Sequence, residues 1–146
     1  MHHGVVPPVK GATVSINRPA SLANHPVDRY HEAWRLLEDR APLEAIDVLD
    51  PAIDAEPKST SLRTLRAWAY FQSAQLEKAE LELRHLVEES PSDVWSRFAL
   101  GRVLERQSRF AEALPQMRLA AVMSADPEHE AAVLRVERLA GQVPGL

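Results

Sequence analysis

The chain has 146 residues, of which 45% are hydrophobic and 26% are charged. These proportions are typical of a folded globular protein and exclude a wholly disordered chain. The formal net charge of −4 gives no electrostatic reason to expect nucleic acid or an anionic membrane as a partner, and the absence of cysteine excludes disulfides and thiolate metal sites.

The first 25 residues predict an extended arm. Glycine and proline recur through them, and no apolar period suits a helix. The arm carries neither the basic opening nor the apolar run of a secretory signal, and no stretch of the chain approaches transmembrane length. We therefore expect a cytoplasmic protein, and the excess of arginine over lysine favours a bacterial source with a GC-rich genome.

From Pro26 onward, apolar residues recur at the three- and four-residue spacing of amphipathic helices. Self-comparison gives a period of 34 residues, at which Ala33, Ala67 and Gly101 align. Four further columns follow the same spacing: Ala45, Ala79 and Ala113; Leu36, Tyr70 and Leu104; Leu49, Leu83 and Met117; Ala52, Leu86 and Ala120. The small residues allow two helix axes to approach closely, which predicts two antiparallel helices in each unit.

Turn signals divide this region into units. The segments Arg40-Ala41-Pro42 and Gln107-Ser108-Arg109 separate helices within units, whereas Pro57 and Pro91 lie between units. We expect a single helical domain over residues 26–146, with units over 26–59, 60–93 and 94–127 and a closing helix over 128–141.

The segment FALGRVLERQSRFAEALPQM, from Phe98 to Met117, resembles a tetratricopeptide repeat. The segments LEAIDVLDPAIDAEP and LEKAELELRHLVEESP resemble the second helices of two more repeats, and EHEAAVLRVERLAG resembles the helix that closes such arrays. The resemblance implies an all-α, right-handed superhelical array of antiparallel helix pairs, a TPR-like α-solenoid that follows the arm. It also implies an adaptor that binds another protein. Separately, we expect no enzymatic activity and no cofactor.

The chain departs from the family pattern in two places. Where the family usually has a large residue early in the first helix, this chain has Arg29, Arg63 and Arg97. Either the arginine stems lie along apolar neighbours with their heads in water, or the first helices are rotated from the usual register. Pro51 and Pro115 fall inside second helices and predict local bends.

Six of the eight aromatic residues occur in pairs at three- or four-residue spacing on first helices. First helices of this family line a concave groove, so the resemblance implies an aromatic floor on the ligand side, flanked by arginines that could orient a ligand carboxylate. The predicted partner-binding residues are Tyr30, Trp34, Leu37, Trp68, Phe71, Trp95, Phe98, Arg102 and Arg106. The other two aromatic residues, Tyr70 and Phe110, occupy core columns in the resemblance.

Several alternatives remain open at this stage. The aromatic residues could instead form core between repeats, and the arginines, with Arg135 and Arg138 of the closing helix, could form a solvated face. The chain could also be a self-assembling structural or regulatory subunit, a homo-oligomer whose groove is covered by its own arm or by a neighbour's. No histidine pair has metal-site spacing, and no phosphate loop or nucleophile motif is present, so we predict no metal, cofactor or catalytic residue.

Overall fold

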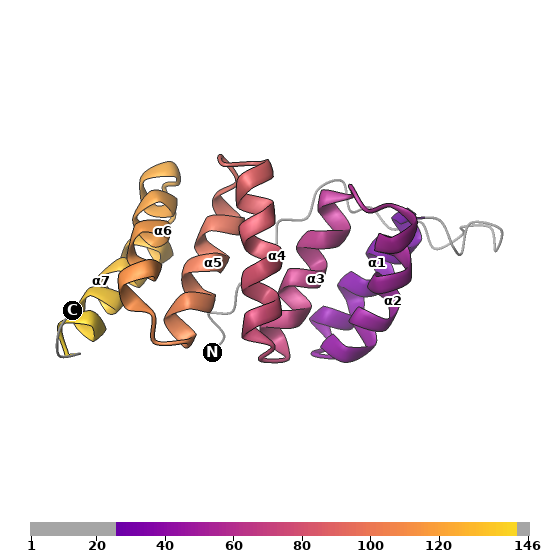
Figure 1. Ribbon diagram of the computed structural model, residues 1–146, viewed down its shortest axis with the longest axis horizontal. Coiled ribbons are helices and arrows are strands. Elements are labelled where there is room, and N and C mark those ends of the chain that lie inside the picture. Colours follow the sequence, from indigo (N-terminus) through magenta and orange to yellow (C-terminus); the bar gives the residue numbers. More distant parts are fainter. Residues whose placement is uncertain (1–25, 143–146) are drawn as a thin grey trace. The chain divides into compact units, whose positions relative to one another are not determined.

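The computed structural model describes residues 26–142, so the predicted arm lies outside the described residues. Seven α-helices follow one another (Figure 1): α1 (Pro26–Glu38), α2 (Pro42–Ala55), α3 (Thr60–Gln72), α4 (Leu76–Glu89), α5 (Val94–Arg106), α6 (Phe110–Met123) and α7 (Pro127–Gly141). Residues 26–142 contain no strand, which confirms the all-α prediction. None of these helices is both long enough and apolar enough to span a membrane.

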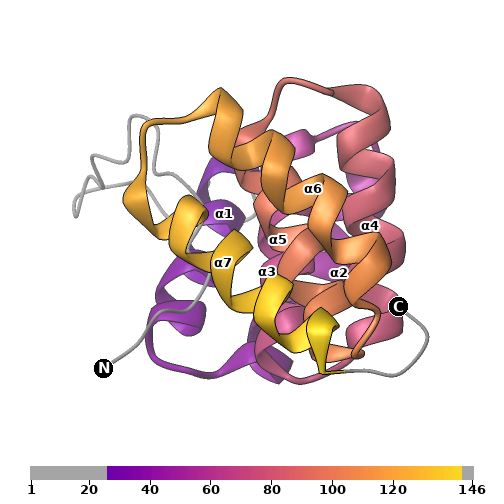
Figure 2. The ribbon, with the colours of Figure 1, turned by 90° about the vertical axis from the view of Figure 1, so that its left-hand side faces the viewer.

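The described residues divide into two compact units, 26–75 and 76–142. In the first unit, α1 packs against α2, and both helices contact α3. In the second unit, α5 packs between α4 and α6, and α6 packs against α7. Figure 2 shows α6 and α7 side by side.

The small residues of the repeat columns lie in the interior. Ala33 and Ala67 are fully covered, as are Ala45 and its two counterparts at the 34-residue spacing. Gly101 is tightly constrained, because a Cβ atom placed there would lie 2.5 Å from Cγ of Met117. The contact between α5 and α6 is therefore too close for any side chain at position 101 unless Met117 moves.

The turns after α1, α3 and α5 share one conformation. Arg40, Ala74 and Ser108 have φ values of 60°, 60° and 59°, in the left-handed region that favours glycine. After α1, the Ala41 N–H donates to the Leu36 carbonyl at 2.8 Å, and the other two turns repeat this bond. This pattern is the Schellman motif, which satisfies the last carbonyls of each helix.

Within residues 26–142, side-chain caps precede α3, α5 and α7. The hydroxyl of Ser59 accepts from the Leu62 N–H at 3.3 Å, and the Asp93 carboxylate accepts from the Trp95 N–H at 3.2 Å. Asp126 caps α7 in the same way. Both α2 and α6 continue past their internal prolines, each of which lies at an exposed position where the missing N–H is least costly.

The arginine column is held by the protein itself. Nε of Arg97 donates to the Pro91 carbonyl at 2.7 Å, and its Nη1 donates to Oε1 of Gln116 at 3.1 Å. Arg63 is buried, and Nη1 of Arg29 lies 3.5 Å from the Glu32 carboxylate. The side chains of Arg63 and Arg97 therefore pack against the protein, and Arg97 is held by hydrogen bonds that the sequence pattern does not reveal.

Candidate partner-binding site

An aromatic cluster joins α1 to α3 in the first unit. The rings of Tyr30 and Trp34 are stacked, with centroids 6.2 Å apart, and His31 meets Tyr30 edge-on at 5.6 Å. Trp34 in turn meets Trp68 of α3 edge-on at 5.3 Å. Offset and edge-on ring pairs of this kind are favourable, so the cluster fixes how the α1 aromatic side chains are presented.

Only the α1 part of the cluster is accessible. Tyr30, His31 and Trp34 are half-buried, whereas Trp68 is buried behind them. Burial raises the pKa of Tyr30, whose phenol is protonated at neutral pH even without this shift. The half-buried surface of Tyr30, His31 and Trp34, called here the α1 aromatic surface, thus combines apolar ring faces with a hydroxyl able to donate a hydrogen bond.

Four of the nine predicted partner-binding residues lie in the interior: Leu37, Trp68, Phe71 and Phe98, each less than a tenth exposed. For the three aromatic residues among them, the structure matches the alternative in which the aromatic positions form core. Of the other two aromatic residues, Phe110 is buried as expected and Tyr70 is half-buried. Of the predicted aromatic residues, only Tyr30, Trp34 and Trp95 are therefore still accessible to a partner.

The closing helix accounts for the burial of Phe98. His129 of α7 lies over the Phe98 ring, with centroids 4.3 Å apart. Nδ1 of His129 and Oγ of Ser124 are 2.6 Å apart, so the imidazole is held in place by a hydrogen bond. His129 is itself buried and contributes to the contact between α5 and α7.

The predicted residues on α5 occupy a charged setting. Trp95 is half-buried near the start of the helix, and Arg106 is exposed at its end. Nε of Arg102 lies 3.5 Å from the Glu105 carboxylate, and burial lowers the pKa of Arg102. Arg135 of α7 donates to both oxygens of the same carboxylate at 2.8 Å, so its guanidinium is engaged within the protein.

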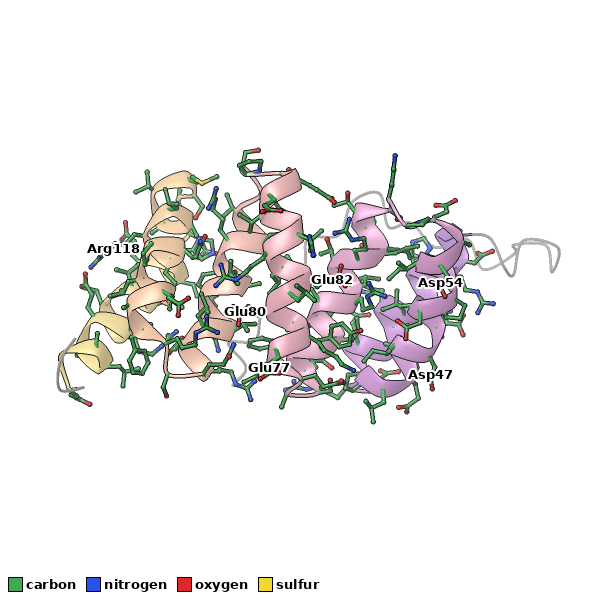
Figure 3. The ribbon with its side chains drawn as sticks, in the orientation of Figure 1. Asp47, Asp54, Glu77, Glu80, Glu82 and Arg118 are labelled. Carbon is green, nitrogen blue, oxygen red and sulfur yellow. The ribbon has the colours of Figure 1, made fainter. Side chains whose placement is uncertain are left out.

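A second charge network joins α4 to α6. Nη1 of Arg109 donates to Glu80 at 2.6 Å, and its Nε and Nη2 donate to the two oxygens of Glu112 at 2.8 Å. Nε of Arg84 donates to the other oxygen of Glu80 at 2.9 Å. Figure 3 shows Glu80 on the side of α4 that faces α5. Burial raises the pKa of Glu80, but the hydrogen bonds from Arg84, Gln107 and Arg109 outweigh this effect and lower it overall.

Sequence reasoning did not identify the exposed apolar side chains of α6 and α7. Leu119, Val122 and Met123 of α6 and Leu134 of α7 are all exposed. A signal was present, because α6 carries apolar residues beyond those needed for its buried face. Among the described residues, no group of three or more His, Asp or Glu side chains is placed to hold a metal ion.

Comparison with solved structures shows the same fold in other proteins. The first TPR domain of the human RPAP3 protein matches with a TM-score of 0.74 and 19% identity, covering 80% of this chain and 92% of that domain. A structure of MamA AMB-1 matches with a TM-score of 0.69 and 19% identity, over 80% of this chain and 64% of MamA. MamA MSR-1 matches with a TM-score of 0.71 and 21% identity, and the match covers 85% of this chain and 71% of that chain.

Sequence comparison agrees with the structural matches. This agreement comes from a family model, because comparison with individual curated proteins finds no match. Residues 36–97 match the family model of the tetratricopeptide repeat, a range that spans α2, α3 and α4 in full. The repeat period, the helix pairs and these matches together show an all-α array of the tetratricopeptide repeat type over the described residues.

Proposed function

We propose that this protein is an adaptor that binds a segment of a partner protein on the α1 aromatic surface. The observation that carries the proposal is the stacked pair of Tyr30 and Trp34, which is half-exposed while its neighbour Trp68 is buried. Aromatic side chains are frequent anchors of protein interfaces because they bury a large area at little entropic cost. The tetratricopeptide repeat fold supports a role in protein–protein interaction.

The chemistry of the surface favours an extended segment with aliphatic or aromatic side chains. Such a segment would place its side chains on the Trp34 indole, and the Tyr30 hydroxyl would donate to one of its backbone carbonyls. Trp95, Arg102 and Arg106 stay in the proposal as a separate contact region on α5. Arg106 is the more exposed of the two arginines and is better placed to meet a ligand carboxylate.

Selection from a displayed library of random short peptides on the immobilised full chain tests the proposal. Peptides with apolar anchors should be enriched, and Trp34→Ala or Tyr30→Ala should weaken their binding by about tenfold or more. Leu43→Ala is a matched control because Leu43 of α2 is 59% exposed and lies outside the aromatic cluster. Selected peptides that bind the Trp34 variant as tightly as the unmodified chain would exclude this surface.

The alternative, in which the chain's own arm covers this surface, predicts a different result in the same assay. Selection on the unmodified chain should then fail, whereas a variant with Val5, Val6 and Val9 changed to serine should select peptides. These three valines are among the apolar residues of the arm.

A further inference from the structure

The second unit exposes a set of large apolar side chains on neighbouring helices. Leu119, Val122 and Met123 lie within about one turn of each other on α6, and Leu134 lies on α7. Val122 is 83% exposed and Leu134 is 60% exposed. These four side chains are called here the end patch.

A salt bridge relates the two halves of the end patch. Arg118 of α6 donates to Glu137 of α7 at 2.9 Å, and Figure 3 shows Arg118 on the side of α6 away from α5. Val122 lies one turn beyond Arg118, and Leu134 lies one turn before Glu137. Since α6 and α7 pack against each other, the salt bridge places both residues on one outer surface.

The end patch differs from the rest of the described surface. Among the other described helices, α2 and α4 each expose a single large apolar side chain, Leu43 and Leu81. Isolated exposed leucines are ordinary, whereas several together on adjacent helices indicate an interaction site.

The charges around the patch indicate what it contacts. Within α6 and α7, the charged residues at three- or four-residue spacing from Val122 and Leu134 are Arg118, Glu130, Glu137 and Arg138, two of each sign. Asp126, four residues after Val122, lies between the two helices and caps α7. The chain as a whole carries a formal net charge of −4, so copies repel each other except through a balanced face. Arg118 and Glu137 already pair with each other, so neither charge needs an ionic group from a partner.

We propose that the end patch is the interface of a two-fold homodimer, in which the patch of one copy packs on the same patch of a second. An isologous interface requires a self-complementary surface, and an apolar centre with a balanced charged border meets that requirement. Four large side chains per copy correspond to an interface below about 1,200 Å², which is the range of weak complexes. The dimer is therefore concentration-dependent, and the residues of its interface are different from those of the α1 aromatic surface.

Light scattering coupled to size-exclusion chromatography, run over a range of concentrations, tests this interface with the full chain. The mass should rise from one copy toward two, and Val122→Glu and Leu134→Glu should each raise the dissociation constant by about tenfold or more. Leu81→Glu is the matched control because Leu81 is 62% exposed on α4, and its dimer should be unchanged. Circular dichroism establishes that each variant is folded. If Val122→Glu does not fold, Val122→Ser replaces it in the same measurement.

Three outcomes would overturn the proposal. The first is an unmodified chain that stays monomeric at every concentration, which would leave the patch to a different partner. The second is a dimer that persists in Val122→Glu and Leu134→Glu. The third is equal loss of the dimer in Leu81→Glu, which would mean that added charge rather than the patch is responsible.

Discussion

The ring centroids of His129 and Phe98 lie 4.3 Å apart, and this contact joins the closing helix α7 to α5. Phe98 is only 4% exposed, so its ring acts as core and not as a surface for a partner. The distinction matters because Phe98 shares its predicted helix face with residues that remain accessible. Substitutions at the two kinds of position should therefore have different effects.

Replacing Phe98 with alanine should lower the free energy of unfolding by about 3–5 kcal/mol, because it removes a buried ring and leaves a cavity. Urea denaturation followed by circular dichroism measures the loss. Leu134→Ala, at an exposed position of α7, should change stability by less than about 1 kcal/mol. Equal effects of the two substitutions would show that Phe98 is not part of the core.

The three left-handed turn residues predict stabilising substitutions. Ala74→Gly and Ser108→Gly should each raise the free energy of unfolding by about 0.5–1 kcal/mol, because glycine adopts positive φ without strain. Ala131→Gly, at an exposed position inside α7, should instead lower stability by about 1 kcal/mol. Thermal denaturation measures all three, and destabilisation by glycine at position 74 would contradict the turn conformation.

Gly101→Ala should destabilise the protein by about 1–3 kcal/mol, although the equivalent residues Ala33 and Ala67 are alanine. The added methyl group meets Cγ of Met117 at 2.5 Å, and Cγ lies too close to the helix backbone to move freely. Combining Gly101→Ala with Met117→Leu should recover part of the lost stability. Leucine is the residue found at positions 49 and 83 of the same column. A stabilised Gly101→Ala variant would mean that α5 and α6 have more space between them.

The Glu80 network predicts a pH dependence of stability. Because the pKa of Glu80 is lowered on folding, its ionised form adds stability above the pKa of the unfolded chain, and that stability is lost as the pH falls through the folded pKa. Glu80→Gln should therefore cost about 1–2 kcal/mol at pH 7, and the difference from the unmodified chain should shrink below about pH 4.

Urea denaturation of both proteins at several pH values measures this difference. Glu88→Gln removes an exposed carboxylate from the same helix and should change stability at pH 7 by less than about 0.5 kcal/mol. A cost of Glu80→Gln that stays constant down to pH 3 would show that the carboxylate is not held by its arginine partners.

The repeat period was enough to predict the all-α fold, because small residues such as Ala33 and Ala67 recur where helices must approach. Periodicity also identified which helix face is apolar. It could not show which neighbour covers that face, so it left open whether the aromatic residues are core or surface. In the structure Phe98 is buried, whereas Trp34 is half-buried and stacks on Tyr30. The contact between Glu80 and Arg109 could not be predicted either, because it joins two residues that are 29 positions apart in the sequence.

The central claim is that the α1 aromatic surface binds a partner segment. Calorimetric titration of a library-selected peptide into the unmodified chain and into folded Trp34→Ala tests it most directly. We predict one binding site in the unmodified chain and affinity weakened by about tenfold or more in the variant, with Leu43→Ala unchanged. Equal affinity for the unmodified chain and for Trp34→Ala would contradict the account.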